Sequence, residues 1–383
     1  MRPPLRVWAW TAATVVLVVA AALLWRGSDA AATESTTAAA PRIPDGAPAA
    51  ELTEAWSRSG DPMPRRVVEG GRVLIAGTDG VRALDGATGE EAWHYTRANA
   101  HLCDLTAVNG VVVAAFRTGD RCDEAVALDA ATGVRTWTRS VNLRGDATLA
   151  STDRIVLAAS PTGVVTLDPT GNSIRWRYAA PDRCRLLGAD VGSTGVAVLQ
   201  HCTGAPSVQL RLLDGFGGDP VWSRNVAAPD GPPIRLVGAD RLIDVVVGDT
   251  LLVHSAQDGT VLQTLPLPPT GTDAHSEPLH QAGVGDVALV WIRGTLRALD
   301  EMTGQVRWEV PALGLPSVGA VAGAVPGAAS VLVPEQDGFV RRDLATGTEE
   351  GRSRMAGLPS GGRAFLVGPV VVYRLPDRVL GYR

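Results

Sequence analysis

Three features of the sequence predict an all-β fold, an eight-bladed β-propeller of four-stranded antiparallel blades. A turn motif followed by a tryptophan recurs along the chain, it recurs with the period of one propeller blade, and the two chain ends each supply part of a last blade. Because each blade packs only on its neighbours, most of the 383 residues can form one domain without a single large core.

The motif is clearest at Ala83–Trp93, which is expected to form two strands joined by a tight turn. The Asp85 side chain can accept hydrogen bonds from the amides that follow it and so begin the turn. Gly89 can take the positive φ angle that closes the turn. Trp93 then presents a large flat surface to whatever packs beside the hairpin.

The same motif returns six times, and one further tryptophan, Trp56, stands near the start without a turn. Four copies keep both the glycine and the tryptophan: Gly133 with Trp137, Gly171 with Trp176, Gly218 with Trp222, and Gly304 with Trp308. Two copies have lost the tryptophan, since Gly259 is followed by Gln263 and Gly347 by Gly351. We expect these glycines and tryptophans to dock each blade on the next.

The spacing of the motif sets the size of the repeat. The anchor positions are 56, 93, 137, 176, 222, 263, 308 and 351, at intervals of 37 to 46 residues. Four short strands fit this interval, as in a propeller blade. Helical repeats of this length would place apolar residues every three to four positions. Here the apolar runs are short, rich in Val and Leu and interrupted by Gly. This pattern excludes helical repeats.

The pattern Ala-x-Asp-x-x-Thr-Gly-x-x-x-Trp at Ala83–Trp93 returns at Ala127–Trp137 and Ala298–Trp308. It resembles the tryptophan-docking repeat of the pyrroloquinoline-quinone-like β-propeller family, over residues 51–383. The resemblance implies the fold but not one function, because the family includes quinoprotein dehydrogenases and non-catalytic scaffolds. The chain is similar in size to a non-catalytic member, the lipoprotein BamB. It lacks a cysteine after its N-terminal segment, so a lipid anchor is not implied.

The N-terminal segment is predicted to anchor the protein in the plasma membrane as a single-pass helix. After a cytoplasmic stretch of residues 1–6, the apolar or weakly polar run Val7–Trp25 is long enough, as a helix, to cross a ~30 Å hydrocarbon core. Arg2 and Arg6 place the N-terminus in the cytoplasm and the propeller outside it. The alternative is a signal peptide cleaved near Ser28–Ala32, although such peptides have apolar cores of about 7–15 residues.

Residues 26–50 contain mostly Gly, Ser, Ala, Thr and Pro, so they are expected to form a flexible linker. The propeller then occupies residues 51–383. Its last blade has only three strands at the C-terminus, expected at Ala364–Val367, Pro369–Arg374 and Arg378–Tyr382. The strand Glu51–Ser57 supplies the fourth and leaves no open sheet edge.

The four cysteines predict two local disulfides, Cys103–Cys122 and Cys184–Cys202, each around one hairpin. Closing a loop of about 20 residues contributes on the order of 3 kcal/mol. Four thiols or one zinc site are the alternatives. Zinc sites usually bring two cysteines within two to four residues, and no pair here is that close.

Other candidate chemistry is sparse. Asp273, His275, Glu277 and His280 cluster in sequence, but their spacing fits no metal motif and is more typical of a solvated loop. The innermost strands carry isolated charges, expected at Glu69, Asp104, Arg185 and Arg235. We therefore predict no catalytic, cofactor-binding or metal-binding residues.

Two functions follow from these observations. The first is a monomeric, extracytoplasmic propeller that acts as a protein-binding scaffold or sensor for partners in the cell envelope. The alternative is a quinoprotein dehydrogenase with pyrroloquinoline quinone and Ca²⁺, a family whose members look longer and carry an adjacent cysteine pair that this chain lacks. A glycan- or lipid-binding propeller has no specific feature in its favour. The net charge of −5 argues against nucleic acid as a partner.

Overall fold

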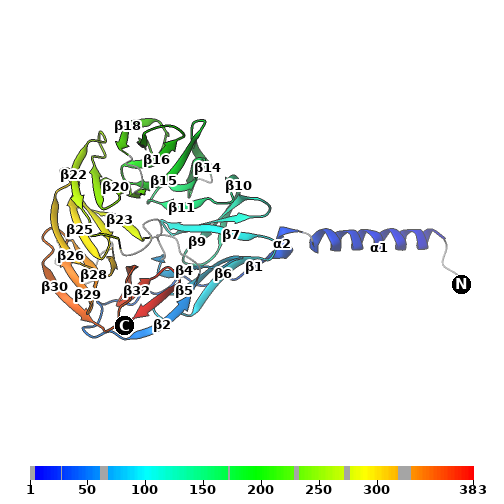
Figure 1. The fold of residues 1–383 in the computed structure, drawn as a ribbon. Coiled ribbons are helices and arrows are strands. Elements are labelled where there is room, and N and C mark those ends of the chain that lie inside the picture. Colours follow the sequence, from blue (N-terminus) through cyan, green and yellow to red (C-terminus); the bar gives the residue numbers. More distant parts are fainter. Residues whose placement is uncertain are drawn as a thin grey trace.

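The computed structural model describes residues 5–26, 28–60, 68–170, 173–227, 233–270, 277–317 and 329–383, with side chains from residue 10 onward. Strands in these ranges form eight sheets, which follow one another around a ring (Figure 1). Within blades two to seven, neighbouring strands are antiparallel and consecutive in the chain. The prediction of an eight-bladed propeller with four-stranded antiparallel blades is therefore confirmed.

Blades two to six each have four strands, and in each blade the strands lie side by side in sequence order. Blade two contains β7 (His101–Val108), β8 (Val111–Arg117), β9 (Arg121–Asp129) and β10 (Arg135–Arg144). Blade three contains β11 (Thr148–Ser151), β12 (Val156–Ser160), β13 (Gly163–Asp168) and β14 (Ser173–Ala179). Blade four contains β15 (Cys184–Gly192), β16 (Gly195–Cys202), β17 (Ser207–Leu213) and β18 (Pro220–Ala227).

The next two blades repeat this order. Blade five contains β19 (Ile234–Gly238), β20 (Ile243–Val247), β21 (Thr250–His254) and β22 (Val261–Pro266). Blade six contains β23 (Leu279–Val284), β24 (Val287–Ile292), β25 (Thr295–Asp300) and β26 (Val306–Pro311). In the described part of blade seven, the strands are β28 (Ser330–Glu335), β29 (Gly338–Asp343) and β30 (Glu349–Arg354).

Blades one and eight meet where the ring closes, and each has an added strand. Blade one contains β3 (Val68–Glu69), β4 (Arg72–Ala76), β5 (Gly80–Asp85) and β6 (Glu91–Arg97), with β1 (Thr33–Ser35) on its outer edge. Blade eight contains β31 (Gly362–Val367), β32 (Val370–Arg374), β33 (Arg378–Tyr382) and β2 (Glu54–Ser59), with β27 (Gly314–Leu315) parallel to β31.

Closure of the ring depends on pairing between the two ends of the propeller sequence. Strand β2 is antiparallel to β33, with Ser57 opposite Leu380 and Arg58 opposite Val379. The N-terminal strand thus becomes the outer strand of a blade whose other three strands are C-terminal, as predicted. Pairing across the ends satisfies backbone groups that would otherwise form a free edge.

The turns between the third and fourth strands form for the reason that the sequence indicates. In blade one, the Asp85 Oδ1 atom accepts hydrogen bonds from the amides of Ala87 (3.0 Å) and Thr88 (3.2 Å). The Gly89 amide donates to the Asp85 carbonyl at 2.8 Å, and Gly89 has a φ of +69°. The same bonds form around Asp300 in blade six.

The apolar side chains are buried in layers between blades rather than in one central core. One cluster joins Trp176 of blade three to Val196 and Val198 of blade four. Another joins Trp308 of blade six to Val331 of blade seven. The innermost strands also touch, because β15 contacts β19 and β19 contacts β23. Blade-to-blade packing therefore fixes the strands from which the described loops extend.

Part of the predicted flexible linker is ordered, which corrects that prediction for these residues. Residues Asp29–Ala32 form the short helix α2, and β1 then pairs with β6, with Thr33 opposite Arg97. The Asp29 Oδ1 atom accepts from Arg97 Nη2 at 2.8 Å. The composition predicted disorder because it offers few apolar side chains. Backbone pairing to an open sheet edge and an ion pair to a buried arginine supply the order instead.

The predicted transmembrane anchor is overturned. The run does form a helix, α1 (Leu5–Arg26), which extends away from the blades in Figure 1. Among the described residues, however, no helix is both long enough and apolar enough to cross a membrane. The prediction rested on run length and counted weakly polar residues such as Thr11 and Thr14 as part of the run. The single-pass plasma-membrane localisation that depended on this anchor is wrong for the same reason.

Candidate functional site

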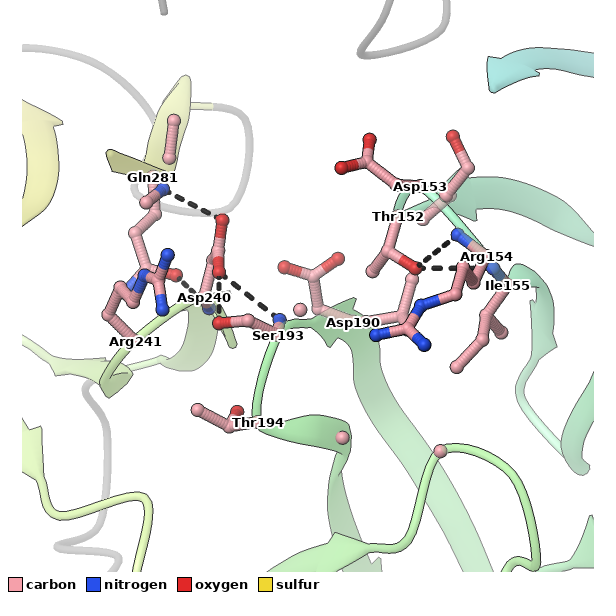
Figure 2. A pocket seen from close by; sticks show the side chains of 18 of the residues that line it. Thr152, Asp153, Arg154, Ile155, Asp190, Ser193, Thr194, Asp240, Arg241 and Gln281 are labelled. Atoms are coloured by element: carbon pink, nitrogen blue, oxygen red, sulfur yellow. Dashed lines mark hydrogen bonds between the residues drawn. The ribbon is translucent and has the colours of Figure 1, made fainter. Parts of the chain in front are cut away.

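A cavity of about 460 Å³ opens beside the propeller axis, where turns of blades three to six converge (Figure 2). Its wall includes the turn after β11, the turn between β15 and β16, and the turn between β19 and β20. Arg363 of blade eight reaches it from the innermost strand β31. The cavity is also lined by the side chains of Arg154, Asp190, Ser193, Phe216, Asp240 and Gln281.

Asp240 is the centre of the polar network in this cavity. Its Oδ1 atom accepts from the Ser193 hydroxyl (2.6 Å) and the Ser193 amide (3.1 Å) of blade four. Its Oδ2 atom accepts from the Gly283 amide of blade six at 2.8 Å. The Asp240 amide in turn donates to Gln281 Oε1 at 2.9 Å. One carboxylate therefore joins three consecutive blades (Figure 2).

The neighbouring polar side chains are bound to backbone in the same way. The Asp190 Oδ2 atom of blade four accepts from the Ala239 amide of blade five at 3.2 Å. Two charges that the sequence placed on innermost strands do likewise in other blades. Glu69 Oε1 accepts from the Gly110 amide at 2.8 Å, and Asp104 Oδ2 accepts from the Leu149 amide at 2.6 Å. These carboxylates hold adjacent blades together near the axis.

Behind the cavity lies a fully buried carboxyl group, Asp244 on β20. The Gln281 Nε2 atom donates to the Asp244 Oδ2 atom at 2.6 Å, while the buried Asp244 Oδ1 atom has no hydrogen-bond partner among the described residues. Burial raises the pKa of Asp244 to about 7, because the charged form loses its hydration there. Burial therefore favours the neutral form of this carboxyl, and Asp244 does not line the cavity.

An aromatic side chain stands at the rim. Phe216 lies in the turn after Asp214 and is 47% exposed. The guanidinium groups of Arg175 and Arg154 lie 4.8 Å and 5.5 Å from its ring centroid. Aromatic and arginine side chains are the types most often found at the centres of protein–protein contacts. The rim therefore has the chemistry of a binding surface.

The cavity does not fit the cofactor of the quinoprotein alternative. Pyrroloquinoline quinone needs Ca²⁺ held by several oxygen ligands and a carboxylate base beside the substrate. Here the carboxylates of Asp190 and Asp240 already accept from backbone amides of adjacent blades. In the described ranges, no three His, Cys, Asp or Glu residues are grouped so that they could hold a metal ion.

The docking residues meet across blade boundaries. The Nε1 atom of Trp93 donates to the Ala130 carbonyl of blade two at 3.0 Å, and a Cβ built on Gly133 would lie 2.7 Å from the Trp93 ring. The indole of blade one therefore covers the turn of blade two. The same indole-to-carbonyl bond is made by Trp137, Trp176, Trp222 and Trp308, at 2.9, 3.1, 2.9 and 2.8 Å.

The remaining docking positions differ in detail. Trp56 packs against Gly89, although its Nε1 atom has no hydrogen-bond partner in the described structure. Gly218 packs on Trp176, whereas Gly304 meets Gln263 of the decayed copy. The Gln263 Nε2 atom donates to the Thr303 carbonyl at 3.4 Å and so imitates the missing indole. Gly171 lies outside the described residues.

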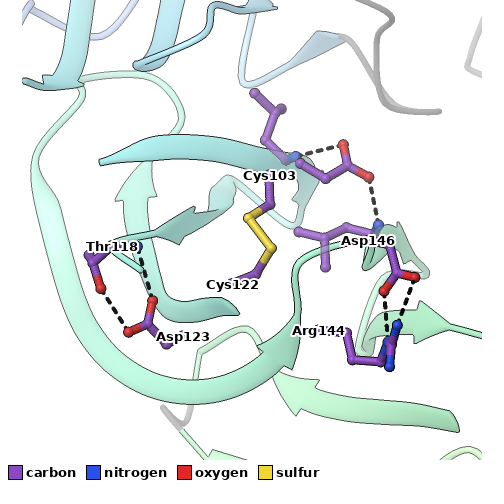
Figure 3. Close-up of a disulfide and its surroundings, with 9 residues drawn as sticks. Cys103, Thr118, Cys122, Asp123, Arg144 and Asp146 are labelled. Atoms are coloured by element: carbon purple, nitrogen blue, oxygen red, sulfur yellow. Dashed lines mark hydrogen bonds and ion pairs between the residues drawn. A yellow bond between two sulfur atoms is a disulfide. The ribbon is translucent and has the colours of Figure 1, made fainter. Parts of the chain in front are cut away.

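Both predicted disulfides are present. Cys103 of β7 is linked to Cys122 of β9 within blade two (Figure 3). Cys184 and Cys202 are linked between paired positions of β15 and β16 in blade four. No described cysteine is free. The side chain of Cys122 is fully buried, while Cys184 and Cys202 are both half-buried.

The Asp273 to His280 cluster is only partly described, because Asp273 and His275 lie outside the described residues. Glu277 is buried, and its Oε2 atom lies 2.9 Å from Arg293 Nε. His280 stacks on Trp291, with ring centroids 5.8 Å apart. For these two residues the prediction of a solvated loop is wrong, because each is packed against β24 or the turn that follows it.

Comparison with known proteins agrees with the repeat. The family model for the outer membrane protein assembly factor BamB matches residues 14–188. No curated protein sequence matches the chain. The solved structure of BamB from Moraxella catarrhalis is 18% identical, with a TM-score of 0.49, over 87% of this chain and 99% of that one.

Two further solved structures are similar in fold. The computationally designed Ika8 protein is 15% identical, with a TM-score of 0.51, over 86% of this chain and 99% of that one. A quinohemoprotein alcohol dehydrogenase from Pseudomonas putida is 13% identical, with a TM-score of 0.49, over 87% and 76%. Likenesses at such low identity concern the fold alone.

The repeated motif, the eight blades and the match over residues 14–188 are consistent with the pyrroloquinoline-quinone-like repeat β-propeller family. The resemblance predicted from the sequence is confirmed. The match to the BamB family model covers only the N-terminal part of the chain, which includes blades one to three.

Proposed function

We propose that this protein is a protein-binding scaffold of the cell envelope that works in an oxidising compartment. The observation that carries the proposal is the exposed ring of Phe216 between Arg154 and Arg175, at the rim of the axial cavity. An apolar ring with flanking guanidinium groups offers a partner both desolvation and directed hydrogen bonds. Two disulfides support the oxidising compartment.

The construction of the cavity supports a binding role. Its carboxylates accept hydrogen bonds from backbone amides of adjacent blades, so they fix the loops that surround Phe216. A surface that is already ordered loses little conformational entropy when a partner binds. The match to a family model named for an assembly factor is consistent with such a role.

The experiment compares capture of envelope proteins by the full chain and by two variants. Met302 occupies the same turn position in blade six that Phe216 occupies in blade four, and it is 61% exposed. Met302→Ala is therefore the matched control for Phe216→Ala. We expect a partner, identified by mass spectrometry, that is retained by Met302→Ala and lost at least tenfold by Phe216→Ala. Equal capture by both variants would contradict the proposal for this surface.

A further inference from the structure

The boundary between blades seven and eight lacks the docking tryptophan that six other boundaries have. In blade one, Trp93 of β6 lies opposite Ala83 of β5. At the corresponding place in blade seven, Gly351 of β30 lies opposite Arg341 of β29. Blade seven therefore has no side chain from β30 where six other blades place an indole, and the Arg341 guanidinium lies beside that position.

The structure contains a cavity of about 210 Å³ at this place. Its floor is formed by the buried side chains of Leu332 and Phe339, which face blade eight. The segment around Pro48 lies over it and is held to the edge of β30, where the Arg354 amide donates to the Ala50 carbonyl at 2.7 Å. Pockets for drug-sized ligands measure about 300–1,000 Å³, so this one suits a single side chain.

Arginine side chains give the cavity its specificity. The Arg341 Nη2 atom lies 3.3 Å from a Cβ built on Gly351, so the guanidinium lies next to the position from which an indole would project. Arg341 also contacts Glu350, with 3.5 Å between Nε and Oε2. Arg352 lines the same cavity. A planar guanidinium next to an apolar floor favours a flat aromatic ring, through stacking and cation–π attraction.

We propose that this cavity binds one aromatic side chain, preferably the indole of a tryptophan, from a partner protein. The proposal rests on the proposed scaffold function, because a partner protein has to supply this side chain. The fold indicates this occupant, because indoles fill the equivalent space at six other boundaries: Trp56, Trp93, Trp137, Trp176, Trp222 and Trp308. At the boundary between blades five and six, the Gln263 side chain takes the place of the indole and donates to the Thr303 carbonyl.

The test titrates N-acetyl-tryptophanamide into the full chain by calorimetry or ligand-observed NMR, with N-acetyl-leucinamide as the aliphatic comparison. We expect a dissociation constant on the order of 0.1–1 mM for the indole, and binding at least fivefold weaker for leucinamide. Because the probe is a small molecule, the result does not depend on whether an envelope partner is captured through Phe216. Equal binding of the two probes would overturn the preference for an aromatic ring.

Two variants test whether the probe binds in this cavity. Gly351→Trp fills the slot from within once the flexible Arg341 side chain shifts, so probe binding should fall at least tenfold. Filling a cavity should also raise the Tm by about 2–4 °C. Gln263→Trp is the matched control, because it adds the same side chain to the slot between blades five and six, and it should leave binding unchanged. Unchanged binding to Gly351→Trp would refute the site.

A second variant covers the case in which Gly351→Trp does not fold. Arg341→Ala removes the stacking guanidinium without adding volume, and the probe should bind at least threefold more weakly. Arg341→Lys keeps the charge but not the plane, so it should restore less than half of the lost affinity. Full affinity in Arg341→Ala would show that the guanidinium has no part in recognition and would also contradict the proposal.

Discussion

Replacing Trp176 tests whether the tryptophans hold the blades together. Trp176 is only 9% exposed and packs on Gly218 of blade four, where its Nε1 atom also donates to Gly215 at 3.1 Å. Burying about 200 Å² of such a side chain contributes about 4–5 kcal/mol, and the hydrogen bond adds about 1 kcal/mol. Since neighbouring groups relax into part of the space, Trp176→Ala should destabilise the fold by about 3–5 kcal/mol.

The matched control is Gln263→Ala at the decayed copy. Gln263 is half-buried and makes one long hydrogen bond, so its removal should cost less than about 1 kcal/mol. Urea unfolding of both variants measures the difference. With a slope of about 3 kcal/mol per M, the midpoint of Trp176→Ala should fall by about 1 M or more. Similar midpoint shifts for both variants would refute the docking role of the tryptophan.

Three further predictions concern the disulfides, the buried carboxyl and the cofactor. Mild reduction should open Cys184–Cys202 before Cys103–Cys122, because Cys122 is fully buried. Reduction should lower the Tm without unfolding the blades. Peptide mapping that finds the reverse order of opening would contradict this prediction. Asp244 keeps its proton to about pH 7 in the folded protein but loses it near pH 4 in the unfolded chain. Its contribution to the free energy of unfolding should therefore fall by about 1.4 kcal/mol per pH unit as pH rises from about 4 to 7. The difference in Tm between wild type and Asp244→Asn across that range measures this contribution, and a constant difference would disprove it. Added pyrroloquinoline quinone with Ca²⁺ should leave no quinone absorbance after desalting and no dye-linked alcohol oxidation; retained absorbance with turnover would revive the dehydrogenase alternative.

Local sequence chemistry was enough to predict much of the fold. The turn at Asp85 depends on a carboxylate and a glycine four residues apart, so its signal is contained within one hairpin. The cysteine pairs lie 19 and 18 residues apart and each closes within one blade. Repetition of such local units reveals the period, and the period gives the number of blades.

The axial cavity could not be predicted in the same way. Asp240 joins Ser193 and Gly283, which lie more than forty residues away on either side in sequence. A carboxylate on an innermost strand gives no sign of the amide that it will meet in the next blade. A signal did exist in Glu69 and Asp104, two such charges on innermost strands, but their shared role as blade-to-blade acceptors appears only after the strands are placed.

The sequence by itself determined the repeating β-propeller, its closure by the N-terminal strand and its two disulfides, because each follows from short-range turn chemistry repeated along the chain. Only the tertiary structure decided that Phe216 stands between two arginines and that the loss of tryptophan at Gly351 leaves a cavity. It also decided that residues 33–35 join blade one. These features depend on which surfaces meet across blade boundaries, and such contacts are fixed by packing rather than by neighbouring residues.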